Sequence, residues 1–280
     1  MTGSLGGALI QAWRARSGRL GAVILLLILV AGALLPAVLP DPARQPCLLC
    51  GAEAPSLAHP LGTDQLSRDV LARVVWGARV SLAVAALAVG LSMTLGALVG
   101  LVAGYAGGWL DALLMRFVDG ALAIPRLFVL LLLLAIITPI PLWLLILVLG
   151  ATGWLGTSRL VRGEVLRLKQ ESYVQAAEAM GAGPARVIFR HLLPNTAGPL
   201  LVAATLAVGD VILLEAGLSF LGLGIQPPRP SWGGMIHDAR DSMIAAPWIS
   251  IFPGLAIIVT VLAVNLVGDA LRDAIDPRNA

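Results

Sequence analysis

Residues 159–195 read RLVRGEVLRLKQESYVQAAEAMGAGPARVIFRHLLPN, a charged and well-punctuated stretch between two long apolar runs. Its first part alternates charged and apolar positions as an amphipathic helix does, and Gly181 and Gly183 end that helix. Pro184 suits the first position of a second helix, which Pro194 ends. A charged helical pair between membrane-like segments has to contact something in water. We therefore expect a docking element for a soluble partner, in a membrane protein that is driven from outside the chain.

The composition excludes an ordinary soluble domain. The 280 residues are 58% hydrophobic and 12% charged, with a mean hydropathy of +0.91, whereas soluble domains carry about 25% charged residues. The sequence pI of about 9.4 does not indicate nucleic-acid binding, because the arginines lie in short segments between apolar runs and form no single patch. This arrangement is typical of a multi-pass membrane protein in contact with lipid.

The apolar runs predict six membrane-spanning helices, because backbone groups in lipid have no water to bond. We expect them over residues 20–39, 80–103, 113–136, 142–159, 197–218 and 249–270. The first run is longer than the apolar core of a secretory signal, which favours a retained span. Arginines gather in residues 1–19, 160–196 and 271–280, which an even number of spans places on one side. The positive-inside tendency makes that side the cytoplasm, so both termini are expected there, at the cytoplasmic (inner) membrane.

Two external segments carry sequence patterns that indicate more structure than a plain loop. Residues 40–79 join the first span to the core of the protein, which we expect over residues 80–270. From Leu66 onward, apolar residues recur every four positions among charged ones, which predicts an interfacial helix over residues 64–79. Residues 222–248 are rich in proline and tryptophan, which favours an ordered cap at the outer interface.

Small residues predict where helices pack. Gly96, Gly100 and Gly104 recur every four residues along the second span. In lipid, small residues in register let another helix approach closely. We therefore expect a close helix–helix contact along this face.

Ionisable residues inside spans are costly and usually face a cavity or a partner. Asp210 and Glu215 lie roughly 140° apart around the fifth span, so one straight helix cannot aim both at one pore. Glu215 and Ser219 share a face and are, with Asn265 of the sixth span, candidates for the translocation path. A structural hydrogen bond between spans is an equal alternative for Glu215. For Asn265, an anchored helix end is the stronger alternative.

Cys47 and Cys50 fall on the expected outer face, an oxidising place in bacteria. A disulfide that pins the loop is our first choice, and free thiols are the second. Together with a distant His59 they fall short of the four or so ligands of a zinc site. We therefore expect no metal on this chain.

Several further motifs occur in order along nearly the whole chain. They are HPLGTD at 59–64, GARVSL at 77–82, GYAGG at 104–108, LSFLGLGIQPP at 218–228 and NLVGD at 265–269. With them, the stretch at 159–195 resembles the EAA loop of ABC-type importer permeases. Together they resemble the second permease subunit of the dipeptide, oligopeptide and nickel family. The resemblance implies an all-α integral membrane fold with six transmembrane helices and a cytoplasmic coupling loop.

In that family a short coupling helix of the EAA loop inserts into the ATP-binding subunit. The resemblance implies an ATPase-coupling role for matching residues, namely Gln175, Ala176, Ala177, Glu178, Gly181, Ala182 and Arg186. The small side chains among them would allow the close approach of a partner. The alternative is a solvated loop whose charges serve topology alone.

The resemblance also implies function and partners. The chain would be the permease subunit of an ATP-driven importer that moves di- or oligopeptides by alternating access, with nickel chelates or glutathione-like solutes as alternatives. Its partners would be a second homologous permease subunit, two ATP-binding subunits carrying ATP and magnesium, and an external solute-binding protein. No P-loop of the form GxxxxGK[ST] occurs here, so this chain would bind no cofactor and be no enzyme. The alternative of another class is an ion-coupled secondary transporter that uses Asp210, Glu215 and Asp269.

The sequence departs from the family pattern at two places that bear on structure. Gln175 stands where the family usually has the glutamate that names the loop, which removes one charge from the coupling surface. Ser67 stands where glycine is usual, which predicts that the backbone there does not need a positive φ.

Overall fold

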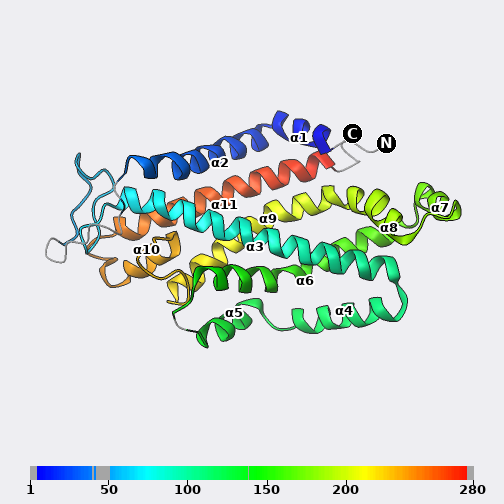
Figure 1. Cartoon of the computed structure of the whole chain (residues 1–280). Coiled ribbons are helices and arrows are strands. Elements are labelled where there is room, and N and C mark those ends of the chain that lie inside the picture. Colours follow the sequence, from blue (N-terminus) through cyan, green and yellow to red (C-terminus); the bar gives the residue numbers. More distant parts are fainter. Residues whose placement is uncertain (1–4, 40, 42–50, 138, 276–280) are drawn as a thin grey trace.

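The computed structural model describes residues 5–39, 41, 51–137 and 139–275, and it is a bundle of long helices joined by turns (Figure 1). The long helices run along one axis, and shorter ones lie at the two ends and, over residues 108–135, along one side. The elements are α1 (Leu5–Arg14), α2 (Arg16–Leu34), η1 (Leu35–Ala37), α3 (Val70–Ala106), α4 (Gly108–Leu122), α5 (Arg126–Ala135), α6 (Leu142–Leu168), α7 (Ser172–Ala179), α8 (Pro184–Val187), η2 (Ile188–Leu192), α9 (Leu193–Phe220), α10 (Trp232–Asp238), η3 (Arg240–Ser242) and α11 (Trp248–Ile275).

The expected all-α membrane fold is confirmed. In the described part of the chain, five helical segments are long and apolar enough to cross a membrane. The pair α4 and α5 passes the same test when taken together, which makes it the candidate for a sixth span, and it is bent by 79° at a short break. The expected positions hold, but α3 begins ten residues earlier than the predicted second span, and α6 ends nine residues later than the fourth.

The interfacial helix expected over residues 64–79 is wrong. Residues 64–69 form turns, and Val70 begins α3, which continues without a break through the second span. The Asp69 side chain caps this helix by accepting a backbone N–H of the first turn at 2.8 Å. Val70 is fully buried in a cluster with Met235 of α10. The apolar stripe therefore faces protein and not lipid.

The close contact predicted from the glycine stripe is confirmed, and the partner helix is α6 of the same chain. A Cβ atom added to Gly96, Gly100 or Gly104 would lie 2.5, 2.6 or 2.8 Å from an atom of α6. No real side chain tolerates such distances without a shift of its neighbour. These glycines therefore let α3 and α6 pack along their length.

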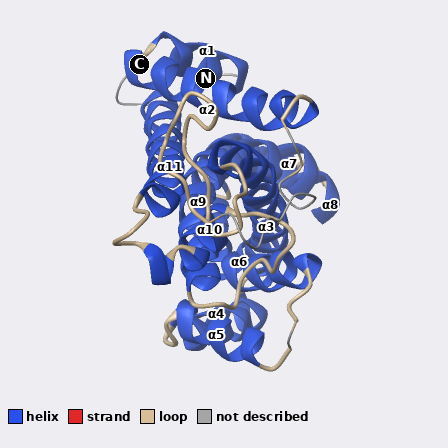
Figure 2. Cartoon of the chain, turned by 90° about the vertical axis from the view of Figure 1, so that its left-hand side faces the viewer, coloured by secondary structure: helices blue, strands red, loops and turns tan. Residues whose placement is uncertain are grey.

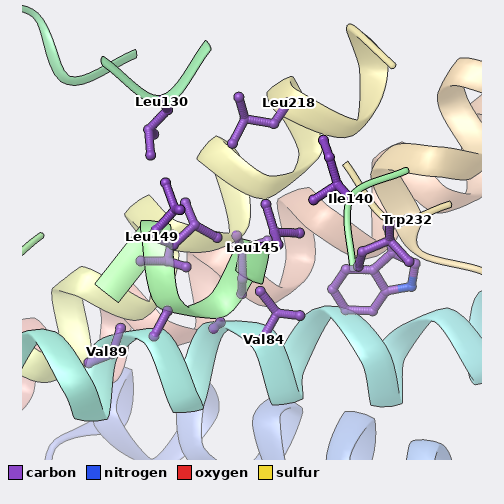
Figure 3. Close-up of a cluster of buried hydrophobic side chains, with 14 of the residues drawn as sticks. Val84, Val89, Leu130, Ile140, Leu145, Leu149, Leu218 and Trp232 are labelled. Atoms are coloured by element: carbon purple, nitrogen blue, oxygen red, sulfur yellow. The ribbon is translucent and has the colours of Figure 1, made fainter. Parts of the chain in front are cut away.

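The main core lies between α3, α6 and α9. Val84, Leu145, Leu149 and Leu218 point toward one another there, with Trp232 of α10 at one edge (Figure 3). Seen along the bundle, α2 and α11 flank this core on one side, and α4 and α5 lie on the opposite side (Figure 2). The long helices thus form a rigid frame that connects two very different ends.

We name these ends by what they carry. The capped end carries residues 51–69, α10 and η3, and the elbow end carries α7, the turn at 180–183 and α8 (Figure 1). Helix α1 packs against the last turns of α11, where Ala12 contacts Ala270 and Leu271. Helix α1 and the last turns of α11 lie toward the elbow end (Figure 1). The described parts of the three arginine-rich segments therefore share one end of the bundle, as an even number of spans requires.

Candidate functional site

The elbow is built by a glycine turn. Helix α7 ends at Ala179, and Gly181 follows with a φ of 83°, a conformation that favours glycine. Its N–H donates to Glu178 O at 2.9 Å, and Ala182 N–H donates to Ala177 O at 3.0 Å, which is the Schellman pattern of helix ends. Pro184 then opens α8, as predicted. The turn thus supplies hydrogen-bond donors to the Ala177 and Glu178 carbonyl groups near the end of α7.

Two predictions about the flanking helices are wrong. The amphipathic pattern before Gly181 is not one helix: α6 runs to Leu168, a turn follows, and α7 begins at Ser172. Pro194 does not end the second helix, because it lies in the first turn of α9, and the chain passes from α8 through the π-helical turn η2 directly into α9. A proline in a first turn removes no hydrogen bond that the helix needs.

The expected coupling residues divide into two groups. Ala177 is buried, and Ala182 is half-buried against the cluster that contains Val174 and Val187. Neither alanine is exposed in this chain, and their coupling role stays a prediction. The other expected coupling residues are exposed, namely Gln175, Ala176, Glu178, Gly181 and Arg186.

Three large side chains of the elbow were missed by the sequence reasoning. Met180 is 83% exposed, Phe189 67% and Tyr173 41%. Partial burial and the nearby Glu171 carboxylate raise the pKa of the Tyr173 phenol, which therefore stays protonated at neutral pH. The missed signal was helical phase: if Val174 and Ala177 face inward, their neighbours at 173, 176 and 180 face outward. We name Tyr173, Met180 and Phe189 the elbow patch.

The arginines expected to set topology also tie helices together. Arg162 of α6 binds Asp111 of α4 through two hydrogen bonds of 2.5 and 2.6 Å. Lys169 donates to Tyr105 O at the end of α3, at 2.9 Å, where a cation suits the helix dipole. Helix α6, which leads into the elbow, is thus attached to α3 and α4. A displacement of the elbow would therefore be passed to those helices.

Glu215 lies in a buried polar cluster that joins three parts of the chain. Its Oε1 accepts from Ser219 Oγ at 2.7 Å, and its Oε2 accepts from Ser81 Oγ of α3 at 3.2 Å. The same two hydroxyls accept the backbone N–H groups of Ile225 and Trp232, at 3.3 and 3.4 Å. Glu215 is 1% exposed. Within this chain, the geometry is that of the structural alternative, a hydrogen bond between spans.

The three candidate pathway residues do not form one site. Asn265 is half-buried on α11 and faces α9 at Gly209, where an added Cβ would lie 3.5 Å from Asn265 Oδ1. Gly209 precedes Glu215 by six residues, a rise of about 9 Å along the helix. The pathway role of Glu215, Ser219 and Asn265 stays a prediction. Cys47 and Cys50, the predicted disulfide, lie outside the described residues.

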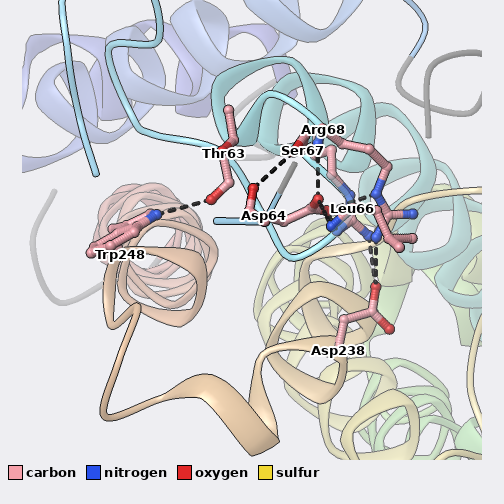
Figure 4. Close-up of polar contacts among 9 residues, drawn as sticks. Thr63, Asp64, Leu66, Ser67, Arg68, Asp238 and Trp248 are labelled. Carbon is pink, nitrogen blue, oxygen red and sulfur yellow. Dashed lines mark hydrogen bonds and ion pairs between the residues drawn. The ribbon is translucent and has the colours of Figure 1, made fainter. Parts of the chain in front are cut away.

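The capped end carries a network of charges (Figure 4). Asp64 Oδ2 accepts from Arg68 Nε at 2.7 Å and from Arg73 Nη1. Arg73 Nη2 donates to Asp238 Oδ2 of α10 at 2.8 Å. Asp64 and Arg73 are both buried. The network therefore fixes α10 onto the start of α3, across a sequence separation of 165 residues.

Ser67 corrects another expectation, since its φ is 53° and the backbone does adopt a positive φ there. Asp64 holds the turn by accepting the N–H groups of Leu66 and Arg68, both at 2.9 Å. Ser67 Oγ donates to Gly51 O at 2.8 Å. The turn is thus imposed by its neighbours, so the residue type at 67 did not reveal the conformation.

Comparison with known proteins agrees with this architecture. The family model described as "binding-protein-dependent transport system inner membrane component" matches residues 96–280. A putative peptide permease protein of Brucella suis is 43% identical over 265 residues, covering 94% of this chain and 87% of the relative. An oligopeptide transport system permease protein of Bacillus subtilis is 38% identical, covering 95% and 88%.

A glutathione transport system permease protein of Pectobacterium atrosepticum is 43% identical over 226 residues, covering 81% of this chain and 75% of the relative. These similarities extend through the elbow and both helices that flank it. The helical bundle, the projecting elbow and the family match agree. The chain belongs to the binding-protein-dependent transport system inner membrane components, the membrane-spanning permeases of ABC importers.

Proposed function

We propose that this chain is the permease subunit of an ATP-driven importer that moves di- or oligopeptides across the cytoplasmic membrane by alternating access. The observation that carries the substrate class is the similarity, over nearly the whole chain, to relatives named as peptide and oligopeptide permeases. Glutathione-like solutes are the second candidate, because a relative of the same identity is named for glutathione transport.

The energy for transport enters from partner subunits in this proposal. Two ATP-binding subunits bind ATP and magnesium and dock on the elbow, a second homologous permease completes the pathway, and a solute-binding protein delivers the cargo. The exposed elbow patch supports the docking role, because large apolar side chains at a polar turn suit a protein interface. The sequence contains no P-loop that would let this chain bind ATP itself.

The orientation follows from the same docking. The elbow end, with the terminal helices, faces the cytoplasm, and the capped end faces the binding protein. Closure of the ATP-binding subunits displaces the elbow, and α6 passes the displacement to α3 and α4 through Lys169 and Arg162. Such a switch is a rigid-body movement between discrete packings of helices.

Reconstitution of the whole transporter in liposomes tests the proposal. We expect uptake of a radiolabelled dipeptide only when ATP is supplied on the side of the ATP-binding subunits and the loaded binding protein on the other. The chain alone should take up no peptide under an ion gradient. Uptake that follows the ion gradient without ATP would favour the secondary-transporter alternative, which uses Asp210, Glu215 and Asp269, and would contradict the proposal.

A further inference from the structure

A cavity of about 240 Å³ lies between α3, α6, α9 and the start of α5. Its wall carries one residue of each charge, Arg126 and Asp210, and two hydroxyl residues, Ser92 and Thr157. The remaining lining residues are small or apolar. The volume is somewhat below the range of about 300–1,000 Å³ that is usual for ligand pockets. Several lining residues are exposed in the single chain, so the cavity opens outward and a second subunit can complete it.

Arg126 is held in position from one side. It is the first residue of α5, at the break between α4 and α5. Its Nη2 donates to Leu149 O at 2.6 Å and its Nε to Thr152 Oγ1 at 3.1 Å, both on α6. A Cβ atom on Gly153 would lie 3.0 Å from Nη2, so the glycine leaves room for the guanidinium. Its Nη1 has no hydrogen-bond partner among the residues that the structure describes.

Asp210 also lines the cavity and carries the opposite charge, but it forms no ion pair with Arg126. It lies well inside the membrane-spanning helix α9 and is exposed in the single chain. No hydrogen bond or ion pair reaches its carboxylate within the described ranges, and Arg126 is therefore farther away than the 4.0 Å of an ion pair. A charged group at this depth is costly unless something binds it. The cavity thus carries two opposite charges that form no ion pair with each other.

We infer, on the basis of the proposed peptide importer, that this cavity is a transient binding site for the peptide in transit. Arg126 binds the peptide's carboxylate and Asp210 binds its α-ammonium group. Every unmodified peptide carries these two charges, whatever its side chains. A site that recognises the ends and leaves the walls small and apolar accepts many sequences. It also replaces the water lost by both termini as they enter the membrane.

The test uses the complete transporter in liposomes with a radiolabelled dipeptide, and it measures peptide uptake and ATP hydrolysis together. Asp210→Asn removes one charge at nearly constant shape, and Arg126→Gln removes the other with a shorter side chain that still carries hydrogen-bonding groups. We expect each to lower the uptake per ATP hydrolysed by about tenfold, the effect of losing one hydrogen bond to a charged group. The stimulation of ATP hydrolysis by the loaded binding protein should remain, because the elbow is unaltered.

A second pair of variants leaves both charges in place. Gly156 lines the cavity, and a Cβ atom added to it would meet no atom within 4 Å, so Gly156→Leu places a large side chain at the cavity. Gly90 of α3 is also an exposed glycine with open space beside it, but it does not line the cavity, so Gly90→Leu is the matched control. We expect Gly156→Leu to lower uptake about tenfold, and tetrapeptide uptake more than dipeptide uptake, while Gly90→Leu transports normally.

The outcomes separate the inference from the function on which it rests. Normal uptake per ATP in the two charge variants and in Gly156→Leu overturns the inference alone. Loss of subunit assembly in Asp210→Asn, with normal uptake in Arg126→Gln and Gly156→Leu, overturns it as well and assigns Asp210 to a contact with the second permease. Failure of the unaltered transporter to take up any peptide overturns the proposed function instead.

Discussion

The capped end and the elbow end are both polar, yet they use their polar residues in opposite ways. At the capped end, Asp64 and Arg73 are buried and bonded to each other, and Trp248 Nε1 donates to Thr63 O at 3.0 Å. At the elbow end, the charged residues are solvated while Met180 and Phe189 are exposed. The capped end pairs its buried charges within the chain, whereas the elbow leaves its charges in water. Large apolar side chains are exposed at both ends, for example Ile244 at the capped end and Met180 at the elbow.

The two ends therefore differ in the contacts that stabilise them. The capped end is stabilised within the chain, because its charges meet partners from distant parts of the same sequence. The elbow is attached through the cluster that packs Val174 and Val187 against residues of α3, α6 and η2. In the proposed importer, the capped end is the firm frame and the elbow is the surface that the ATP-binding subunits displace.

The largest expected effect is on the capped end. Arg73→Ala would remove one of the two arginines that pair with the buried Asp64 carboxylate, and we expect a cost of about 3 kcal/mol in the free energy of unfolding, the lower end for a broken buried ion pair because Arg68 stays bound. Thermal unfolding of the purified chain in detergent measures this cost. Arg240→Ala is the control, because Arg240 is exposed and its ion pair with Asp241 is a long one of 3.7 Å. Equal melting of the two variants would show that the network does not stabilise the cap.

A smaller effect is expected where the cap meets the spans. Glu215→Ala would remove the acceptor of the Ser81 and Ser219 hydroxyls, and we expect it to destabilise the chain by about 2 kcal/mol. Glu215→Gln keeps an acceptor and nearly the same shape, so it should recover most of that loss. Melting temperature and uptake are measured together. Intact melting with lost uptake in both variants would instead support the pathway role of Glu215.

The comparison is sharpened at the elbow by Gly181→Val. A β-branched residue at a φ of 83° adds strain of about 1–3 kcal/mol, which the loosely attached turn can relieve by moving. We expect the uptake per ATP hydrolysed to fall about tenfold, about 1.4 kcal/mol of coupling, while the melting temperature changes little. Gly183→Val is the control, because Gly183 has an ordinary negative φ. Normal coupled uptake in Gly181→Val would contradict the docking role.

The smallest effect is expected from Gln175→Glu, which adds the charge that the family usually has there. Gln175 is exposed, and among the described residues its side chain makes only a long hydrogen bond of 3.4 Å to Gln170 O. The free energy of unfolding should change by less than about 0.5 kcal/mol. ATP hydrolysis stimulated by the binding protein reports on the coupling surface and should change by no more than a few-fold. A large loss would show that the partner contact was rebuilt around the amide.

Sequence patterns predicted the features that depend on one helix at a time. The spacing of Gly96, Gly100 and Gly104 correctly indicated a packing face, because the helical repeat alone puts those residues together. The turn at Gly181 was also predictable, since a left-handed residue after a helix favours glycine.

Features that depend on distant partners could not be predicted in this way. The stripe from Leu66 to Val74 showed which side of the helix is apolar but not whether lipid or α10 covers it. The burial of Arg73 depends on Asp238, far along the chain. The burial of Ala177 could not be predicted either. Which side of the short helix α7 faces inward depends on the packing of Val174 in one cluster with Val187 of α8.

The π-helical turn η2 connects the elbow to the membrane-spanning helix α9 and fixes the length of that connection. A wide turn of this kind holds about one residue more than an α-helical turn. Deleting one residue from Ile188–Leu192 would restore an ordinary turn and rotate everything before it by about 100° about the α9 axis. The side chains of Met180 and Tyr173 would then face a different direction and would no longer align with a partner bound to the elbow. The number of residues in this short segment, more than their identity, therefore sets the rotation of the elbow relative to α9.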